Sequence, residues 1–259
     1  MRIKKSNLIL NLILPILTIL GIFLIWFFAS IIVNEEIILP TPIDTIKELF
    51  RLFGEKVFWV GIGGTLIRSF VAFTSSFIIA SGLALLTKYS KVGKSIIAII
   101  VSIIRALPTI AVILLLLLWT NSKVASIIVT MIVILPTIYN SQLQGLNVID
   151  PEILEMFKVY GVSKKVQFKK YILPQVTPPM IETIGSGLSL NIKLIVASEV
   201  IASVGRSIGQ LMNESKVYFE TAQLFALVLI IIVIAVIIEF LSHVIAGKFR
   251  RKYGNKKSN

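Results

Sequence analysis

Cysteine is absent from this sequence, and histidine occurs once among its 259 residues. The absence of cysteine excludes a disulfide framework, a cysteine-ligated iron–sulfur cluster and a thiol nucleophile. The single histidine, His243, leaves little from which to build a zinc site, and its place near the end of an apolar run favours a membrane-interface position over a proton relay. We therefore expect neither a metal nor a cofactor bound to this chain.

Charged residues are also scarce, and apolar residues are in excess. Asp, Glu, Lys and Arg make up 15% of the chain, against about 25% in ordinary soluble domains, whereas 56% of the residues are apolar. A mean hydropathy of +0.92 argues against a water-soluble enzyme. The same composition excludes a disordered chain, which needs low hydrophobicity. We predict an all-α protein that crosses a membrane several times.

Six apolar stretches are candidates for helices that cross the bilayer, each of which takes roughly 20 residues. They are Leu8–Val33, Leu66–Leu86, Ser95–Trp119, Val124–Tyr139, Ile181–Val204 and Leu224–Ala246. The fourth is short and needs flanking residues near Ser122 or Asn140 to complete it. The first is longer than the apolar core of a signal peptide, which spans about 7–15 residues, so we interpret it as an uncleaved span.

Positive charges are distributed unevenly between the two sides that six spans define. Seventeen of the 26 Lys and Arg residues fall on the side of both termini, and six fall on the other. By the positive-inside rule, this asymmetry predicts that both termini lie in the cytoplasm. Basic residues beside an anionic leaflet also account for the net charge of +13, so no nucleic-acid partner is needed.

The connection between the fourth and fifth stretches, residues 141–180, is much longer than ordinary connections. Within it, Asp150 is a suitable N-cap, Pro151 suits a first helical turn, and Gly161 suits a left-handed C-cap. These signals predict a helix over 151–160 that is about 15 Å long. Its apolar side chains share one face: Ile153, Leu154, Phe157 and Tyr160. That face suits contact with either lipid or a partner protein.

Four residues of this loop resemble the EAA motif of ABC-importer permeases. In that motif Glu-Ala-Ala is followed by three residues, Gly, nine residues, Ile, one residue and Leu-Pro. The matching residues are Glu155, Gly161, Leu173 and Pro174. Met156 and Phe157 replace the two alanines, and Tyr171 replaces the isoleucine.

The flanking segments resemble the nitrate/sulfonate/taurine/thiamine-precursor subgroup of these permeases. Leu39–Pro42, with the amphipathic stretch Ile43–Phe53 after it, is similar to an external Leu-Pro-Ser-Pro segment. Thr65–Arg68 resembles the opening of the second span, and Arg105–Pro108 resembles a Leu-Arg-Pro-x-Pro stretch. Two acidic residues also fall in place: Glu199 and Glu239. The similarity extends from about residue 38 to residue 251.

The resemblance implies a type I ABC-importer fold and a non-catalytic permease subunit in a prokaryotic inner membrane. Such permeases pair as dimers, and the EAA helix of each docks into a groove of a separate ATP-hydrolysing subunit that binds the ATP. A binding protein delivers the substrate from outside. The implied coupling residues are Glu155, Met156, Phe157, Gly161, Leu173 and Pro174. Met156 and Phe157 would face the ATPase, and Glu155 would orient the helix.

Polar residues inside the predicted spans mark the translocation path, because intramembrane charge is costly and usually functional. Four are candidates: Arg105, Ser189, Lys193 and Glu199. Lys193 and Arg105 would each contact either an anionic substrate or an internal carboxylate, such as Glu199 for Lys193, and these alternatives stay open. Arg68 lies close enough to the outer end of its span to reach the interface, so we expect it to be structural.

The whole pattern predicts one transmembrane domain over residues 1–259, with a core over about 60–250 and an external amphipathic segment at 34–60. We expect a permease subunit that imports a small solute, for which the cationic residues favour an anion such as a sulfonate or nitrate, with a thiamine precursor left open. The alternative is a stand-alone ion-coupled secondary transporter. That alternative predicts inverted repeats, which the sequence does not show, and leaves the capped loop helix without a purpose.

Overall fold

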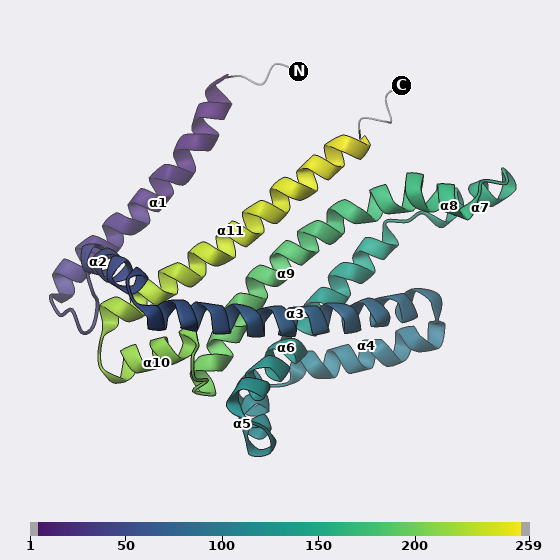
Figure 1. Ribbon diagram of the computed structural model, residues 1–259. Helices are drawn as coiled ribbons and strands as arrows, with labels where there is room; N and C mark the ends of the chain where they lie inside the picture. Colours follow the sequence, from purple (N-terminus) through teal and green to yellow (C-terminus); the bar gives the residue numbers. More distant parts are fainter. Residues whose placement is uncertain (1–4, 255–259) are drawn as a thin grey trace. The chain divides into compact units, whose positions relative to one another are not determined.

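The computed structural model describes residues 5–254, and every regular element in that range is a helix (Figure 1). In chain order the elements are α1 (Lys5–Val33), α2 (Pro42–Phe53), α3 (Lys56–Tyr89), α4 (Lys91–Ala106), α5 (Thr109–Trp119), α6 (Ser122–Asn147), α7 (Pro151–Val159), α8 (Lys164–Gln167), the π-helix η1 (Phe168–Ile172), α9 (Leu173–Ile201), α10 (Ile208–Val217) and α11 (Thr221–Gly254). The all-α prediction is confirmed. The topology prediction also counted basic residues at both ends of the chain. Some of these lie outside the described residues, among them Arg2, Lys4 and Lys256.

The chain folds as two compact units. Unit 1 comprises the residues up to Trp59 together with Leu211–Ile230, and unit 2 comprises Val60–Gln210 together with the chain from Ile231 onward. Unit 2 thus contains most of the predicted core and the whole of the long loop. The prediction of a single transmembrane domain stays a prediction.

Five of the described helices are long and apolar enough to cross a membrane. The qualifying segments are Ile16–Val33 in α1, Lys56–Tyr89, Ser122–Asn147, Lys164–Ile201 and Thr221–Phe249. They correspond to five of the six predicted stretches. The fourth of those predictions, which was too short by itself, is completed on both sides within α6.

The third predicted stretch is not one continuous helix. It is divided into α4 and α5, which meet at an angle of 91° around Leu107 and Pro108. Proline lacks a backbone N–H and disfavours helical geometry in the residue before it, and Leu107 accordingly has extended backbone angles. The stretch was predicted as one span, and the bend within it was not foreseen; the pair makes a sixth crossing as a broken span.

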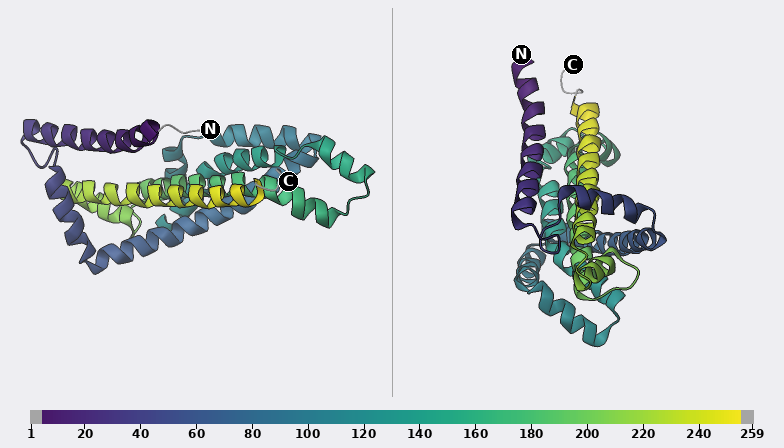
Figure 2. Two further views of the ribbon diagram at one scale, coloured as in Figure 1. Left: turned by 90° about the horizontal axis from the view of Figure 1, so that it is seen from above. Right: turned by 90° about the vertical axis from the view of Figure 1, so that its left-hand side faces the viewer.

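The core of unit 2 lies where α3, α4 and α6 pack together. Figure 2 shows α3 doubling back into α4, and the Ser90 hydroxyl caps the new helix by accepting a hydrogen bond from the Gly93 N–H at 3.0 Å. Buried side chains from all three helices form one apolar cluster: Phe73, Ala80, Ala84, Ile97, Val101, Ile134, Ile138 and Tyr139. α9 then packs along α6 (Figure 1), so α6 is covered on several sides.

Unit 1 contains the predicted external amphipathic segment, which forms α2. Thr41 caps this helix, because its hydroxyl oxygen accepts a hydrogen bond from the Asp44 backbone N–H at 3.1 Å. The Thr41 hydroxyl also donates to the Asp44 carboxylate at 2.6 Å, and Lys47 pairs with that carboxylate at 2.9 Å. These two contacts, the Thr41 bond first, lower the pKa of Asp44.

Candidate functional site

The helix predicted in the long loop is present as α7, and its N-terminus is capped as expected. The Asp150 carboxylate accepts a hydrogen bond from the Glu152 backbone N–H at 2.9 Å, and Pro151 occupies the first turn. A side-chain cap of this kind satisfies a backbone donor that the helix leaves unpaired. The start of α7 is therefore held by the sequence itself.

The C-terminus of α7 ends in a Schellman cap. Gly161 has a φ of +65°, the left-handed region that glycine enters without the steric cost of a Cβ atom. The Val162 N–H bonds to the Phe157 carbonyl at 2.9 Å, and the Gly161 N–H bonds to the Lys158 carbonyl at 3.1 Å, which are the two bonds of this motif. The predicted cap is confirmed, with the last helical residue at Val159.

An aromatic contact closes the loop from within. The rings of Phe157 and Tyr171 meet edge to face, with centroids 5.5 Å apart and an interplanar angle of 76°. The Tyr171 hydroxyl oxygen also accepts a hydrogen bond from the Asp150 backbone N–H at 3.3 Å. Tyr171 thus contacts both ends of α7. This contact was not predictable, because the sequence shows only that Tyr171 stands where the motif has isoleucine and does not show which side chain it will meet in the folded chain.

The resemblance implied that Met156 and Phe157 face the ATPase, but the exposed side chains of this loop are a different set. Phe157 is half-buried against Tyr171, whereas Met156 is exposed. Two further apolar residues lie in the open, Val159 at 83% and Tyr160 at 76% exposure. Of the remaining motif residues, Glu155 and Leu173 are exposed and Pro174 is half-buried in the first turn of α9. The loop therefore presents an apolar patch of Met156, Val159 and Tyr160.

A buried ion pair joins two helices of unit 2. Arg68 on α3 donates from Nε to Oε1 of Glu199 on α9 at 2.7 Å, and the two residues are 8% and 0% exposed. The other carboxylate oxygen accepts from the Thr65 hydroxyl at 2.8 Å and from the Gly209 N–H at 3.4 Å. A Cβ at Gly209 would collide with Glu199, so glycine permits this close approach. Every side of the carboxylate is thus occupied by the protein.

This ion pair bears on two predictions. Arg68 was expected to be structural, and its buried contacts agree with that role. The expected direction was wrong, because its guanidinium does not extend toward the membrane interface but bonds inward to Glu199 and, at 3.2 Å, to the Arg206 carbonyl. Glu199 was the proposed internal partner of Lys193, yet it is taken by Arg68. Among the described residues, Lys193 has no carboxylate within ion-pair distance, and its side chain is exposed.

Polar residues occupy several sides of α9, and several of them are buried, among them Ser189, Asn191, Ser198 and Glu199. The Asn191 amide donates to both the carbonyl and the hydroxyl of Ser69 at 2.7 Å. Ser198 contacts Thr130 at 3.3 Å through their hydroxyl groups. These bonds fix α9 against α3 and α6.

The exposed residues of α9 form a separate stripe. They recur at intervals of three or four positions along one side of the helix: Ser186, Leu190, Lys193, Ala197 and Ile201. A lysine on this surface is costly beside lipid tails. Arg105, the other cationic candidate, is also exposed, at the end of α4 beside the bend.

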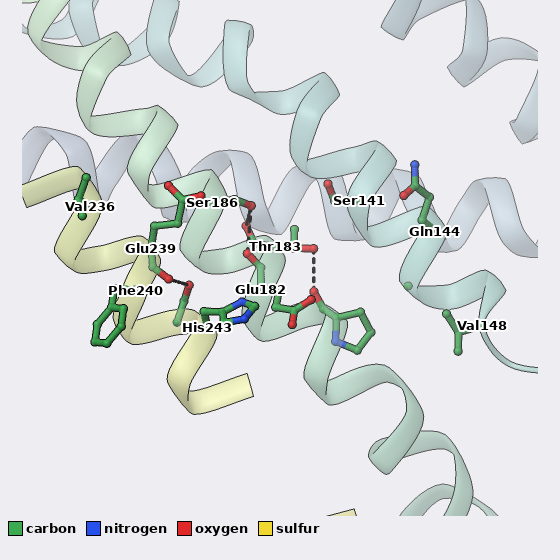
Figure 3. A pocket seen from close by; sticks show the side chains of 13 residues that line it. Ser141, Gln144, Val148, Glu182, Thr183, Ser186, Val236, Glu239, Phe240 and His243 are labelled. Atoms are coloured by element: carbon green, nitrogen blue, oxygen red, sulfur yellow. Dashed lines mark hydrogen bonds between the residues drawn. The ribbon is translucent and has the colours of Figure 1, made fainter. Parts of the chain in front are cut away.

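An open cavity of about 730 Å³ lies between α6, α9 and α11. Figure 3 shows Glu239 and His243 on α11 and Glu182 on α9 around this space, with Ser141 of α6 across from them. Ser189, a predicted path residue, donates to Glu239 at 3.5 Å. The cavity was not predicted, because its residues come from three distant parts of the sequence. The described residues contain no cluster of three or more His, Cys, Asp or Glu that could hold a metal.

Comparison with known proteins identifies the family. The model of the binding-protein-dependent transport system inner membrane component family matches residues 76–253. The chain belongs to this family. It is also 21% identical over 220 residues to the taurine transport system permease protein TauC of Escherichia coli strain K12, covering 83% of this chain and 80% of that protein.

Solved structures show the same fold. An inward-facing structure of the MetNI methionine ABC transporter has a TM-score of 0.59 and 21% identity, covering 76% of this chain and 99% of that chain. An amino acid ABC transporter crystallised with histidines has a TM-score of 0.57 and 19% identity, covering 76% of this chain and 94% of that chain. The protein is therefore the permease component of an ABC importer, a multi-pass inner-membrane subunit that works with an ATPase and a substrate-binding protein.

Proposed function

We propose that this permease imports a small sulfonate-like anion and that α7 couples it to a separate ATPase subunit, which binds the ATP. The likeness to a taurine permease supports the solute class. The exposed Lys193 supports an anion, because a cationic side chain along the path offsets the cost of moving a negative charge through the bilayer.

The observation that carries the proposal is the architecture of α7. Capped at both ends and braced by Tyr171, this nine-residue helix is a rigid element. Its patch of Met156, Val159 and Tyr160 has no cover within the described residues. A rigid helix that presents apolar side chains to a partner transmits a displacement, which a flexible loop would absorb.

The same proposal gives a function to the exposed stripe of α9. Lys193 cannot face lipid at low cost, so it faces water in the path or a second permease. We infer that two copies pair along this stripe and that the path runs between them. With α7 toward the ATPase, both termini lie in the cytoplasm, in agreement with the excess of basic residues on that side.

ATP-dependent uptake in proteoliposomes tests the function as a whole. The permease is reconstituted with its ATPase and binding protein, and radiolabelled taurine, nitrate and a thiamine precursor are compared. We expect uptake of the sulfonate that requires internal ATP and the binding protein. Uptake by the permease alone under an ion gradient would contradict the proposal and favour a secondary transporter.

A further inference from the structure

Helix α2 of unit 1 carries an apolar face that the described protein leaves uncovered. Four large apolar residues recur at intervals of three and four positions and are between 41% and 68% exposed: Ile43, Ile46, Phe50 and Phe53. A second face, with Thr45 and Leu52, is buried. The helix therefore has one face packed on the protein and another that is apolar and open.

The remaining side of α2 is charged and internally paired. Lys47 bonds to Asp44 at 2.9 Å, and Arg51 bonds to Glu48 and Glu55. Charged residues along one side and aromatic and aliphatic residues along another are typical of a helix that lies in the plane of a membrane surface.

Contacts with α1 set the depth of the start of α2. The indole N–H of Trp26 donates to the Pro40 carbonyl at 3.0 Å, two residues before α2 begins. Trp26 lies inside the apolar segment Ile16–Val33, seven residues before its end, which is about 10 Å along a helix axis. The beginning of α2 is thus held level with the outer part of a membrane span.

The far end of α2 is held in the same way at α3. Only Gly54 and Glu55 separate the two helices. The indole N–H of Trp59 donates to the Phe53 carbonyl at 2.9 Å, and the two rings stack with centroids 6.0 Å apart. Because α3 is itself a candidate membrane span that begins at Lys56, both ends of α2 are attached to candidate spans.

We propose that α2 is an interfacial helix whose face of Ile43, Ile46, Phe50 and Phe53 inserts into the headgroup and acyl boundary of the bilayer. The partner is the lipid surface, because this face continues into exposed Val57 and Trp59 at the start of a membrane span. Tryptophan at that position is typical of the membrane interface. The helix thereby anchors the α1–α3 connection, whatever solute the permease carries.

Site-directed spin labelling tests this insertion directly, because the chain has no cysteine to remove. Single variants Ile46→Cys, Phe50→Cys and the matched control Lys47→Cys are labelled with a nitroxide in the full chain and reconstituted in phosphatidylcholine–phosphatidylglycerol liposomes. Collision rates are measured with oxygen, which enters lipid, and with a water-soluble nickel chelate. We expect the oxygen-to-nickel ratio to be several-fold higher at positions 46 and 50 than at 47.

Two results would overturn the proposal. Equal and high nickel accessibility at positions 47 and 50 would place the apolar face in water. Protection of position 50 from both reagents would mean that a protein, either a second copy or a partner subunit, covers it. The measurement is repeated with the ATPase subunit bound. The same oxygen-to-nickel ratios in both states would show that the contact with lipid is also present in the assembled transporter.

Discussion

At the scale of single residues, the carboxylate of Glu199 is a buried charge that the surrounding protein has to compensate. It is fully buried and depends on Arg68, Thr65 and the Gly209 N–H for compensation. Burying two opposite charges stabilises little by itself, but removing one partner leaves the other charge unpaired.

Breaking this pair is therefore expected to be severe. Arg68→Ala should cost about 3–5 kcal/mol, because Glu199 stays buried without a counter-charge. Thermal unfolding in detergent measures the loss, and Arg105→Ala is the matched control, since that arginine is exposed. The paired replacement Arg68→Met with Glu199→Leu should recover much of the stability. Equal stability of Arg68→Ala and the control would show that the ion pair is not formed.

The lowered pKa of Asp44 gives a second test at this scale. The chain contains two aspartates, Asp44 and Asp150, so selective carboxyl ¹³C labelling yields two titrating signals, which Asp150→Asn assigns. Since the Thr41 hydroxyl bond is the main cause, Thr41→Val should raise the pKa of Asp44 toward its ordinary value of about 4.

The sign of the associated stability effect follows from linkage. A carboxyl with a lowered folded pKa stabilises the fold above its unfolded pKa, and that contribution disappears as pH falls through the folded value. In the wild type, α2 should therefore become less ordered as the pH falls through the folded pKa of Asp44. Thr41→Val should lose this dependence on acid pH, whereas Lys123→Gln should keep it. An unchanged Asp44 titration in Thr41→Val would contradict the assignment of the cause.

At the scale of elements, α7 depends on the left-handed residue at its end. Gly161→Val places a β-branched side chain at φ +65° and should cost about 1 kcal/mol or more. We expect ATPase activity to lose its dependence on transport while membrane insertion is retained. Gly161→Asn is the matched control, because asparagine tolerates the left-handed region. Wild-type coupling in Gly161→Val would argue against α7 as the coupling helix.

The difference between α7 and the α4–α5 bend shows what local sequence can reveal. Asp150, Pro151 and Gly161 act on their own backbone, so the helix and both caps were predictable. The break at Leu107 and Pro108 was missed because apolar residues continue on both sides of it, with Arg105 as the only charged residue of the stretch, and because proline is tolerated inside membrane helices. Hydropathy detects that a stretch prefers lipid but carries no signal for its direction.

At the scale of the whole molecule, contacts between distant segments were beyond the sequence. Arg68 and Glu199 are 131 positions apart, and each was assigned another role. The cavity of Glu182, Glu239 and His243 likewise depends on which faces of α9 and α11 meet. Periodicity identified the helices and the polar character of α9, but not which helix each polar side faces.

The inferred path along the exposed stripe of α9 is testable at Lys193. Lys193→Gln should lower anion uptake several-fold, mainly through a higher apparent KM, whereas Lys193→Arg should retain most of it because the charge remains. Lys164→Gln, an exposed lysine in the long loop, is the control. If Lys193→Gln transports like the wild type, the stripe does not line the path for an anion.

The most direct measurement of the central claim is site-specific cross-linking from α7 to the ATPase subunit. Tyr160→Cys and Val159→Cys in the cysteine-free chain carry a photoactivatable label in membranes that contain the assembled transporter. The account predicts a cross-link to the ATPase from both positions, with a yield that changes when ATP is bound, and none from Lys47→Cys on α2. Cross-links only to lipid, with the ATPase present and active, would contradict the assignment of α7 as the coupling helix.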